Sequence, residues 1–251
     1  LGGSFAATTA PARLASASIA SFARGAVPFF GLAALGAAAV LLQPDTDTFV
    51  IMMVAATALF LATGGKWGHA LALGCLGALI VAGLALSRPY IMNRITAFID
   101  PSADPQGASY QINQSLIALG SGGLFGRGFG QGIQKFEHLP EPVSDSIFAV
   151  YGEEFGFVGS AFLVLLFSCF ALRGYAIAAS APERFGMLLV VGLTTLIISQ
   201  AYLNIASMLG LVPLSGLPLP FISQGGTALL AALASVGIIL NVSKYRTRSR
   251  Q

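Results

Sequence analysis

Charged residues are scarce in this chain. Asp, Glu, Lys and Arg make up 9% of its 251 residues, whereas soluble domains carry about a quarter, so an ordinary water-soluble domain is excluded. The scarcity is uneven, because residues 185–243 contain no acidic residue, no basic residue and no histidine. That stretch has room for two membrane crossings of about 20 residues each. The net charge of +3 is small and does not indicate a nucleic-acid partner.

Cysteine and histidine are also rare. The two cysteines, Cys75 and Cys169, lie within apolar runs, where free thiols behave as small hydrophobic side chains. They form neither a disulfide framework nor a paired metal motif. His138 has no second histidine or cysteine nearby in the sequence, which argues against zinc. The sequence therefore predicts no metal site built from the side chains of this chain alone.

Six apolar runs have about the length of a membrane crossing. They are residues 26–43, 48–64, 69–87, 146–172, 185–210 and 227–243. We therefore predict an all-α fold, a polytopic transmembrane helical bundle over 26–243 with a large extracytoplasmic loop at 88–145. A short N-terminal segment, 1–25, precedes the bundle and a basic tail, 244–251, follows it. The chain starts with Leu1, and its first 25 residues do not resemble a signal peptide, so we expect a longer protein with further sequence upstream.

The basic residues beside the apolar runs predict the orientation, because cytoplasmic loops are enriched in Lys and Arg. Alternate crossings place on one side the basic residues of the N-terminal segment, of the short loops and of the tail: Arg13, Arg24, Lys66, Arg173, Arg184 and Lys244. We expect this side to be cytoplasmic, with both termini inside. The outer side then receives residues 43–47, 88–145 and 211–226, which carry most of the acidic residues. Any polar chemistry is therefore expected on the outer face.

The long outer connection contains two features that argue against a plain linker. Residues 110–119 have apolar positions at helical spacing, and residues 120–130 are rich in glycine. The glycines fit neither a Walker motif nor a dinucleotide-binding motif. Two interpretations remain open: tight turns that return the chain to the membrane surface, or backbone amides that hold an anionic ligand together with Arg127 or Lys135.

Asp145 stands where the fourth apolar helix begins. One interpretation makes it the N-cap of that helix. In the other, Ser144 is the cap and Asp145 lies in the first turn, partly shielded from water, as a general base. Glu153 and Glu154 follow two turns later, either as functional groups or as interhelical hydrogen-bonding groups.

A second outer segment, residues 210–227, is apolar but holds three prolines, which forbid a regular helix. Irregular backbone at this depth must be surrounded by protein or line a water-filled cavity, so we predict a re-entrant or interfacial loop beside the site. Gln200 and Asn204 in the preceding helix are expected to form interhelical hydrogen bonds.

At these segments the sequence closely resembles the SEDS family (shape, elongation, division, sporulation). The resemblance lies in residues 107–130, 135–156 and 210–227, supported by the shorter motifs at 43–45 and 88–90. It covers nearly all of the chain after Val27, and the ending at 237–243 is more similar to the division member than to the elongation member. Members of this family have ten membrane helices. The resemblance implies that the six predicted here are the last six, and that four more lie upstream and complete the lipid groove.

The resemblance also implies a function. Family members polymerise peptidoglycan glycan strands from lipid II at the outer face of the bacterial cytoplasmic membrane. They work with a class B penicillin-binding protein transpeptidase and, in cell division, with other divisome membrane proteins. The family's catalytic aspartate corresponds to Asp145 by motif position, its functional glutamate to Glu137, and its basic loop positions to Lys135 and Arg88.

This implies an inverting glycosyltransferase in which Asp145 is the base and positive charge holds the leaving pyrophosphate. The charge is expected from Arg88, Arg94, Arg127, Lys135 or a divalent cation, Mg²⁺ or Mn²⁺. Gln111 and Ser223 complete the predicted substrate-binding set. Two alternatives remain: a flippase or transporter for lipid-linked precursors, with Glu153, Glu154, Gln200 and Asn204 lining its path, and a non-catalytic division scaffold.

Overall fold

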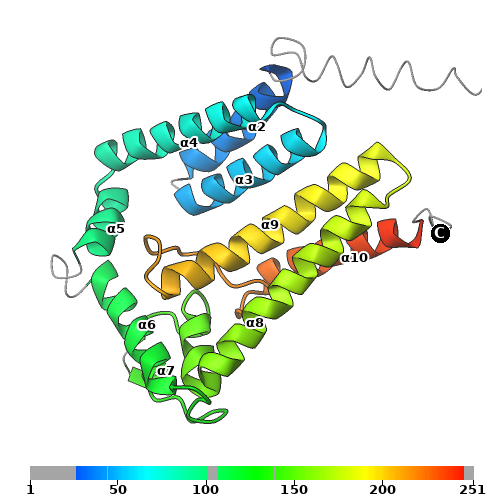
Figure 1. Ribbon diagram of the computed structural model, residues 1–251. Coiled ribbons are helices and arrows are strands. Elements are labelled where there is room, and N and C mark those ends of the chain that lie inside the picture. Colours follow the sequence, from blue (N-terminus) through cyan, green and yellow to red (C-terminus); the bar gives the residue numbers. More distant parts are fainter. Residues whose placement is uncertain (1–26, 44, 101–106, 138, 246–251) are drawn as a thin grey trace, which may run out of the picture. The chain divides into compact units, whose positions relative to one another are not determined.

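The computed structural model describes residues 27–43, 45–100, 107–137 and 139–245 (Figure 1). The predicted N-terminal segment with Arg13 and Arg24, His138, and the tail beyond residue 245 lie outside the described residues. Within the described ranges every regular element is a helix and there is no strand. The chain divides between Ile80 and Val81 into two units, each described by itself below.

The first unit contains α2 (Val27–Leu42), α3 (Thr46–Ala62) and most of α4 (Trp67–Ser87), which continues into the second unit. Helices α2 and α3 pack against each other. Helix α3 begins at a defined cap, because the Asp45 carboxylate accepts the Thr48 backbone N–H at 3.0 Å and the Thr48 hydroxyl at 2.5 Å. This satisfies one of the unpaired amides that every helix start exposes.

The second unit holds the remaining helices. They are α5 (Pro89–Ile99), α6 (Ala108–Gly122), α7 (Gln134–Glu137), α8 (Ile147–Ala179), α9 (Arg184–Met208) and α10 (Gly226–Lys244). Helix α8 is the centre of this unit, since it packs along α9 on one side and against α6 near its start, while α10 packs mainly on α9 (Figure 1). The core between them includes Phe148, Ile198, Met208 and Leu219.

All six predicted crossings are helices in the structure, and the fold confirms the all-α membrane prediction. Four of them, α4, α8, α9 and α10, are long and apolar enough to span a membrane. Helices α2 and α3 are apolar but have 16 and 17 residues, below the usual 20 or so. The fourth helix runs to Ala179, beyond the predicted end at 172, because its apolar character continues past Arg173.

Helix α8 is interrupted at Gly156, where the backbone has φ 67° and ψ −165°. This region is open almost only to glycine. In a regular helix the amides of Phe157 and Val158 donate to the carbonyls of Glu153 and Glu154. Here they donate instead to Gly123 O (2.9 Å) and Leu124 O (3.1 Å), on the segment that follows α6.

The two α8 carbonyls released by this kink are also used. Glu153 O accepts the Arg127 N–H and Glu154 O accepts the Gly128 N–H, both at 3.0 Å. The glycine-rich segment at residues 123–128, named here the glycine loop, therefore inserts into the hydrogen-bond ladder of α8 and replaces two helical bonds with four. A side chain on Gly126 would collide with the Glu154 carbonyl, which explains the glycine there. The amides of Arg127 and Gly128 are occupied by α8, so they do not form the anion cradle considered above.

Replacing Gly156 by alanine is expected to lower the free energy of unfolding by about 3 kcal/mol, from backbone strain alone. The added Cβ would also lie 2.7 Å from Leu124 O. The measurement is the thermal unfolding midpoint of the full-length protein in detergent. The matched control is Gly120→Ala, since Gly120 lies in α6 with nothing near its Cβ position and alanine favours a helix. Equal midpoints for the two variants would contradict the loop insertion.

Candidate functional site

Asp145 lies in the turn that precedes α8 and is not part of the helix. The N-cap of α8 is Ser146, which is completely buried. The amides of Ser144 and Ser146 both donate to Glu141 O at 3.2 Å, which closes the turn and starts the helix later than the sequence suggested. The predictions that Asp145 or Ser144 caps the helix, or that Asp145 lies in its first turn, are therefore wrong.

The backbone on either side of Asp145 is fixed by three hydrogen bonds. The carbonyls of residues 143, 144 and 145 each accept one bond from a distant part of the chain. In that order, the donors are the Gln224 N–H (2.8 Å), Ser223 Oγ (2.6 Å) and Asn204 Nδ2 (2.7 Å). Three consecutive carbonyls thus bind the turn to α9 and to the segment that follows it, and this sets the position of the Asp145 backbone.

The irregular segment between α9 and α10 is held by the same kind of contact. Asn204 Nδ2 also donates to Leu217 O and Gln200 Nε2 donates to Pro218 O, each at 2.7 Å. The Leu219 amide donates to Ser223 Oγ at 2.7 Å. The predicted loop beside the site is present at residues 209–225, and Gln200 and Asn204 bind it rather than another helix.

The Asp145 carboxylate and the Arg94 guanidinium of α5 both lie close to Gly216. Ser144 Oγ donates to Asp145 Oδ1 at 2.9 Å. A Cβ built on Gly216 would lie 3.7 Å from Asp145 Oδ2 and 3.3 Å from Arg94 Nη2, so the carboxylate and the guanidinium face the same point. The guanidinium also lies over the Tyr90 ring, 4.5 Å from its centroid, a favourable cation–π contact. Gly216 was not singled out from the sequence, although a glycine between two prolines is a signal of close backbone approach.

Gln111 and Ser223 reach the site indirectly. Gln111 Nε2 donates to Ser146 Oγ at 3.0 Å, and that hydroxyl donates to Pro140 O at 2.8 Å. Ser223 holds the carbonyl of Ser144. Both side chains therefore support the turn that carries Asp145. Arg88 is the N-cap of α5, the helix that carries Arg94, and it is partly buried.

Lys135 and Arg127 belong to a second cluster around two buried carboxylates of α8. Lys135 Nζ lies 2.6 Å from Glu154 Oε1, and Arg127 Nε lies 3.8 Å from Glu153 Oε1. Glu153 is completely buried and accepts the amides of Ile133 (3.0 Å) and Gln134 (3.2 Å). These glutamates therefore anchor the residues that follow the glycine loop. Glu137 ends α7, and its side chain lies outside what the structure describes.

The described residues offer no ready-made cage for a metal ion. No group of three or more His, Cys, Asp or Glu side chains gathers in the described ranges.

The fold and the site together define a multi-pass helical membrane protein in which a carboxylate from an interhelical turn and a guanidinium from α5 lie close to the same glycine. The sequence matches the FtsW/RodA/SpoVE family of cell cycle proteins over residues 5–248. The chain belongs to that family, which confirms the resemblance found in its motifs.

Two curated relatives illustrate the match. The chain is 43% identical over 227 residues to stage V sporulation protein E of Bacillus subtilis, covering 90% of this chain and 62% of that protein. It is 39% identical over 222 residues to the probable peptidoglycan glycosyltransferase FtsW of Geobacter sp. strain M18, covering 88% and 60%. The chain therefore spans about six tenths of the length of these relatives.

Two solved structures share the fold. One chain comes from a structure described as showing structural coordination of polymerization and crosslinking by a peptidoglycan synthase complex. It superposes with a TM-score of 0.73 at 26% identity, covering 95% of this chain and 67% of that one. The other is a mutant of the rod shape determining protein RodA of Thermus thermophilus, with a TM-score of 0.58 at 25% identity, covering 93% and 63%.

The ion pair of Lys135 and Glu154 gives a test of the second cluster. Lys135→Met leaves a carboxylate that is only 6% exposed without its partner, and we expect it to lower the free energy of unfolding by about 3 kcal/mol. The double variant Lys135→Met/Glu154→Gln removes the stranded charge and should recover most of the loss in thermal midpoint. Arg127→Met is the control and should cost less than about 1 kcal/mol, because its ion pair is long (3.8 Å), its side chain is 40% exposed, and Glu153 keeps the amides of Ile133 and Gln134. A Lys135→Met protein as stable as wild type would contradict the anchoring role.

Proposed function

We propose that the full-length protein is a peptidoglycan glycosyltransferase that polymerises glycan strands from lipid II during cell division. The observation that carries the proposal is the Asp145 carboxylate, which lies close to Gly216 together with the Arg94 guanidinium, on a turn whose backbone is fixed by three hydrogen bonds. The names of relatives such as FtsW support the reaction class.

In the proposed reaction Asp145 is the general base. It takes the proton of the 4-hydroxyl of the acceptor N-acetylglucosamine, and the oxygen attacks the anomeric carbon of the N-acetylmuramic acid donor. The bond from that carbon to the pyrophosphate oxygen breaks, and undecaprenyl pyrophosphate leaves with the bonding electrons. A single displacement inverts the configuration at the anomeric carbon.

Arg94 is the group proposed to stabilise charge in this reaction, because its guanidinium lies near Gly216 as the Asp145 carboxylate does, and a guanidinium can bind two phosphate oxygens in a bidentate manner. Arg88 precedes it on the same helix and is proposed as a second phosphate contact. Lys135 and Arg127 lie beside Glu154 and Glu153, so their proposed contribution is to the local potential. Glu137 keeps its predicted role in substrate binding.

A divalent cation, Mg²⁺ or Mn²⁺, enters the proposal only as an ion that arrives with the substrate. Mg²⁺ commonly binds through one or two carboxylates together with substrate phosphates, so the pyrophosphate of the substrate would supply most of the protein-independent ligands. Such an ion would neutralise part of the charge of the leaving pyrophosphate.

The proposed setting is the bacterial cytoplasmic membrane, with the site on the outer face and both termini in the cytoplasm. A class B penicillin-binding protein transpeptidase and other divisome membrane proteins are the proposed partners. The structural similarity to a chain of a peptidoglycan synthase complex supports a synthase partner, and the basic residues flanking the helices support the orientation.

The transporter alternative is weakened by the contacts of the residues that were expected to line its path. Glu153 and Glu154 are bound by amides and by Lys135. Gln200 and Asn204 are bound to loop carbonyls. Each of these side chains has a structural role within the fold. A non-catalytic scaffold would need no acid–base site at all, so the test below separates it from the enzyme.

Full-length Asp145→Asn should polymerise lipid II at least about 100-fold more slowly than wild type, because general base catalysis contributes roughly 10²–10⁴-fold. The measurement is the length and amount of glycan chains made from labelled lipid II by reconstituted protein, with a lipid II transport assay alongside. Glu141→Gln is the matched control, an exposed carboxylate in the same turn. Wild-type polymerisation by Asp145→Asn would refute the assignment, and wild-type protein that transports lipid II without polymerising it would favour the transporter.

A further inference from the structure

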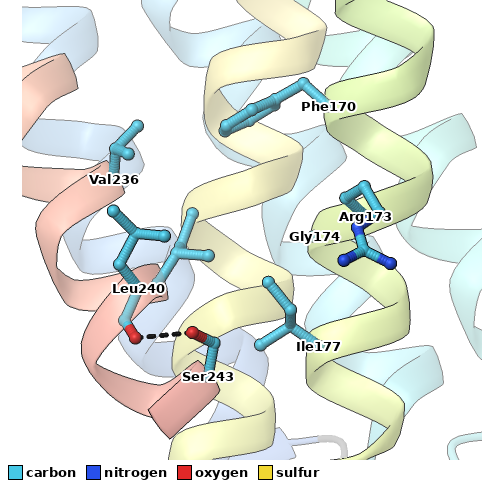
Figure 2. Close-up of a pocket in the computed structure, with 8 residues that line it drawn as sticks. Phe170, Arg173, Gly174, Ile177, Val236, Leu240 and Ser243 are labelled. Atoms are coloured by element: carbon cyan, nitrogen blue, oxygen red, sulfur yellow. Dashed lines mark hydrogen bonds between the residues drawn. The ribbon is translucent and has the colours of Figure 1, made fainter.

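A pocket of about 350 Å³ lies between the second half of α8 and the last turns of α10 (Figure 2). Its volume falls within the usual range of small-molecule sites, roughly 300–1,000 Å³. The walls are mainly apolar, with Phe170 and Ile177 from α8 facing Val236 and Leu240 from α10. It is a site separate from Asp145, which precedes the other end of α8.

Two polar side chains interrupt the apolar lining. Arg173 of α8 and Ser243 of α10 both line the pocket. The Ser243 hydroxyl donates to its own helix, at Leu240 O (2.7 Å), as Figure 2 shows. Arg173 is exposed and forms no ion pair with a carboxylate in the described part of the chain. The pocket therefore joins an apolar cleft to one uncompensated positive charge.

The location of this charge indicates the kind of molecule that would compensate it. Arg173 stands about two turns before the end of α8, and Ser243 is followed by Lys244 at the end of α10. In the orientation proposed above this end meets the cytoplasmic leaflet. An arginine at this depth extends its guanidinium toward the lipid headgroups, and basic pockets between membrane helices on this side bind anionic headgroups.

We propose that this pocket binds one anionic phospholipid of the cytoplasmic leaflet. An acyl chain occupies the cleft between Phe170, Ile177, Val236 and Leu240, and the phosphate binds the Arg173 guanidinium, which suits phosphate geometry. Because α10 packs mainly on α9 and much less on α8, the lipid fills the space between α8 and α10 and couples these two helices.

The test uses full-length protein reconstituted in vesicles of equal phosphatidylglycerol and phosphatidylcholine, extracted gently and examined by native mass spectrometry. Wild type should retain one phosphatidylglycerol in preference to phosphatidylcholine. Arg173→Gln should lower phosphatidylglycerol retention about fivefold, the usual effect of one cation near a headgroup. Leu240→Trp fills the cleft and should lower retention of both lipids, and it is tolerable for folding because Leu240 is 55% exposed. Arg184→Gln, a cation at the same end of the bundle, should retain the lipid as wild type does.

Several outcomes overturn this proposal. They are equal retention by Arg173→Gln and wild type, equal retention of the two lipids by wild type, and undiminished retention by Leu240→Trp. A photo-crosslinking residue at position 236 that captures a protein instead of a lipid would also overturn it, since the occupant would then be a partner helix. The readout is lipid binding and not glycan synthesis, so these results leave the proposal for Asp145 untouched.

Discussion

The insertion of the glycine loop into α8 is the contact on which the second unit of this fold depends. Buried backbone groups must be paired, and the requirement is stricter for a helix that enters a membrane. The four hydrogen bonds between residues 123–128 and 153–158 pair these buried groups, and they allow α8 to change direction at Gly156. The buried carboxylates of Glu153 and Glu154 strengthen the same junction by holding residues 133–135. The connection from α6 to α8 is thereby fixed to the helix that it precedes.

The turn with Asp145 is held by contacts from a different part of the chain. The turn with Asp145 leads directly into the anchored part of α8, and its three consecutive carbonyls are bound by α9 and by the segment after it. The side chain of Asp145 therefore extends from a backbone whose position is set on both sides. A base held in place before substrate arrives has less reorganisation to undergo during reaction. We infer that the backbone hydrogen bonds, rather than a helix cap, set the position of this carboxylate.

The sequence predicted the helices well because the length of an apolar run in a membrane protein is a direct physical constraint. It grouped Asp145, Arg94, Gln111 and Ser223 in one predicted site. In the structure Gln111 and Ser223 bond the turn that carries Asp145, and Arg94 lies near Gly216 as Asp145 does, while the roles of these residues stay predictions. It misjudged the start of α8, because Ser144, Asp145 and Ser146 are all acceptable caps by residue type and only the bond pattern to Glu141 distinguishes them. The loop insertion could not be predicted at all. Backbone-to-backbone contact between distant segments leaves no signature except glycine, and the glycines at 126 and 156 are equally compatible with ordinary turns.

The ion pair of Lys135 is another contact between distant segments that the sequence does not predict. Its residue type and its loop fit a substrate contact, yet the nearest carboxylate is Glu154, 19 residues away in the chain. Such a pairing depends on the path of the glycine loop and on nothing in the local sequence. Asn204 is a polar residue in an apolar helix, so the sequence predicts that it forms a hydrogen bond. Its two acceptors, Asp145 O and Leu217 O, are known only from the fold.

Asn204 also provides the most direct test of the claim that these bonds position the base. Its side chain is completely buried and cannot touch a substrate. The measurement is the turnover rate of glycan polymerisation by full-length Asn204→Leu at a temperature where the protein is folded. Ser199→Ala, which removes a hydroxyl bonded only to its own helix, is the control. The account predicts a fall of roughly 100-fold for Asn204→Leu, the effect of a misplacement of about 1 Å, and little change for the control. A wild-type rate in folded Asn204→Leu protein would contradict it.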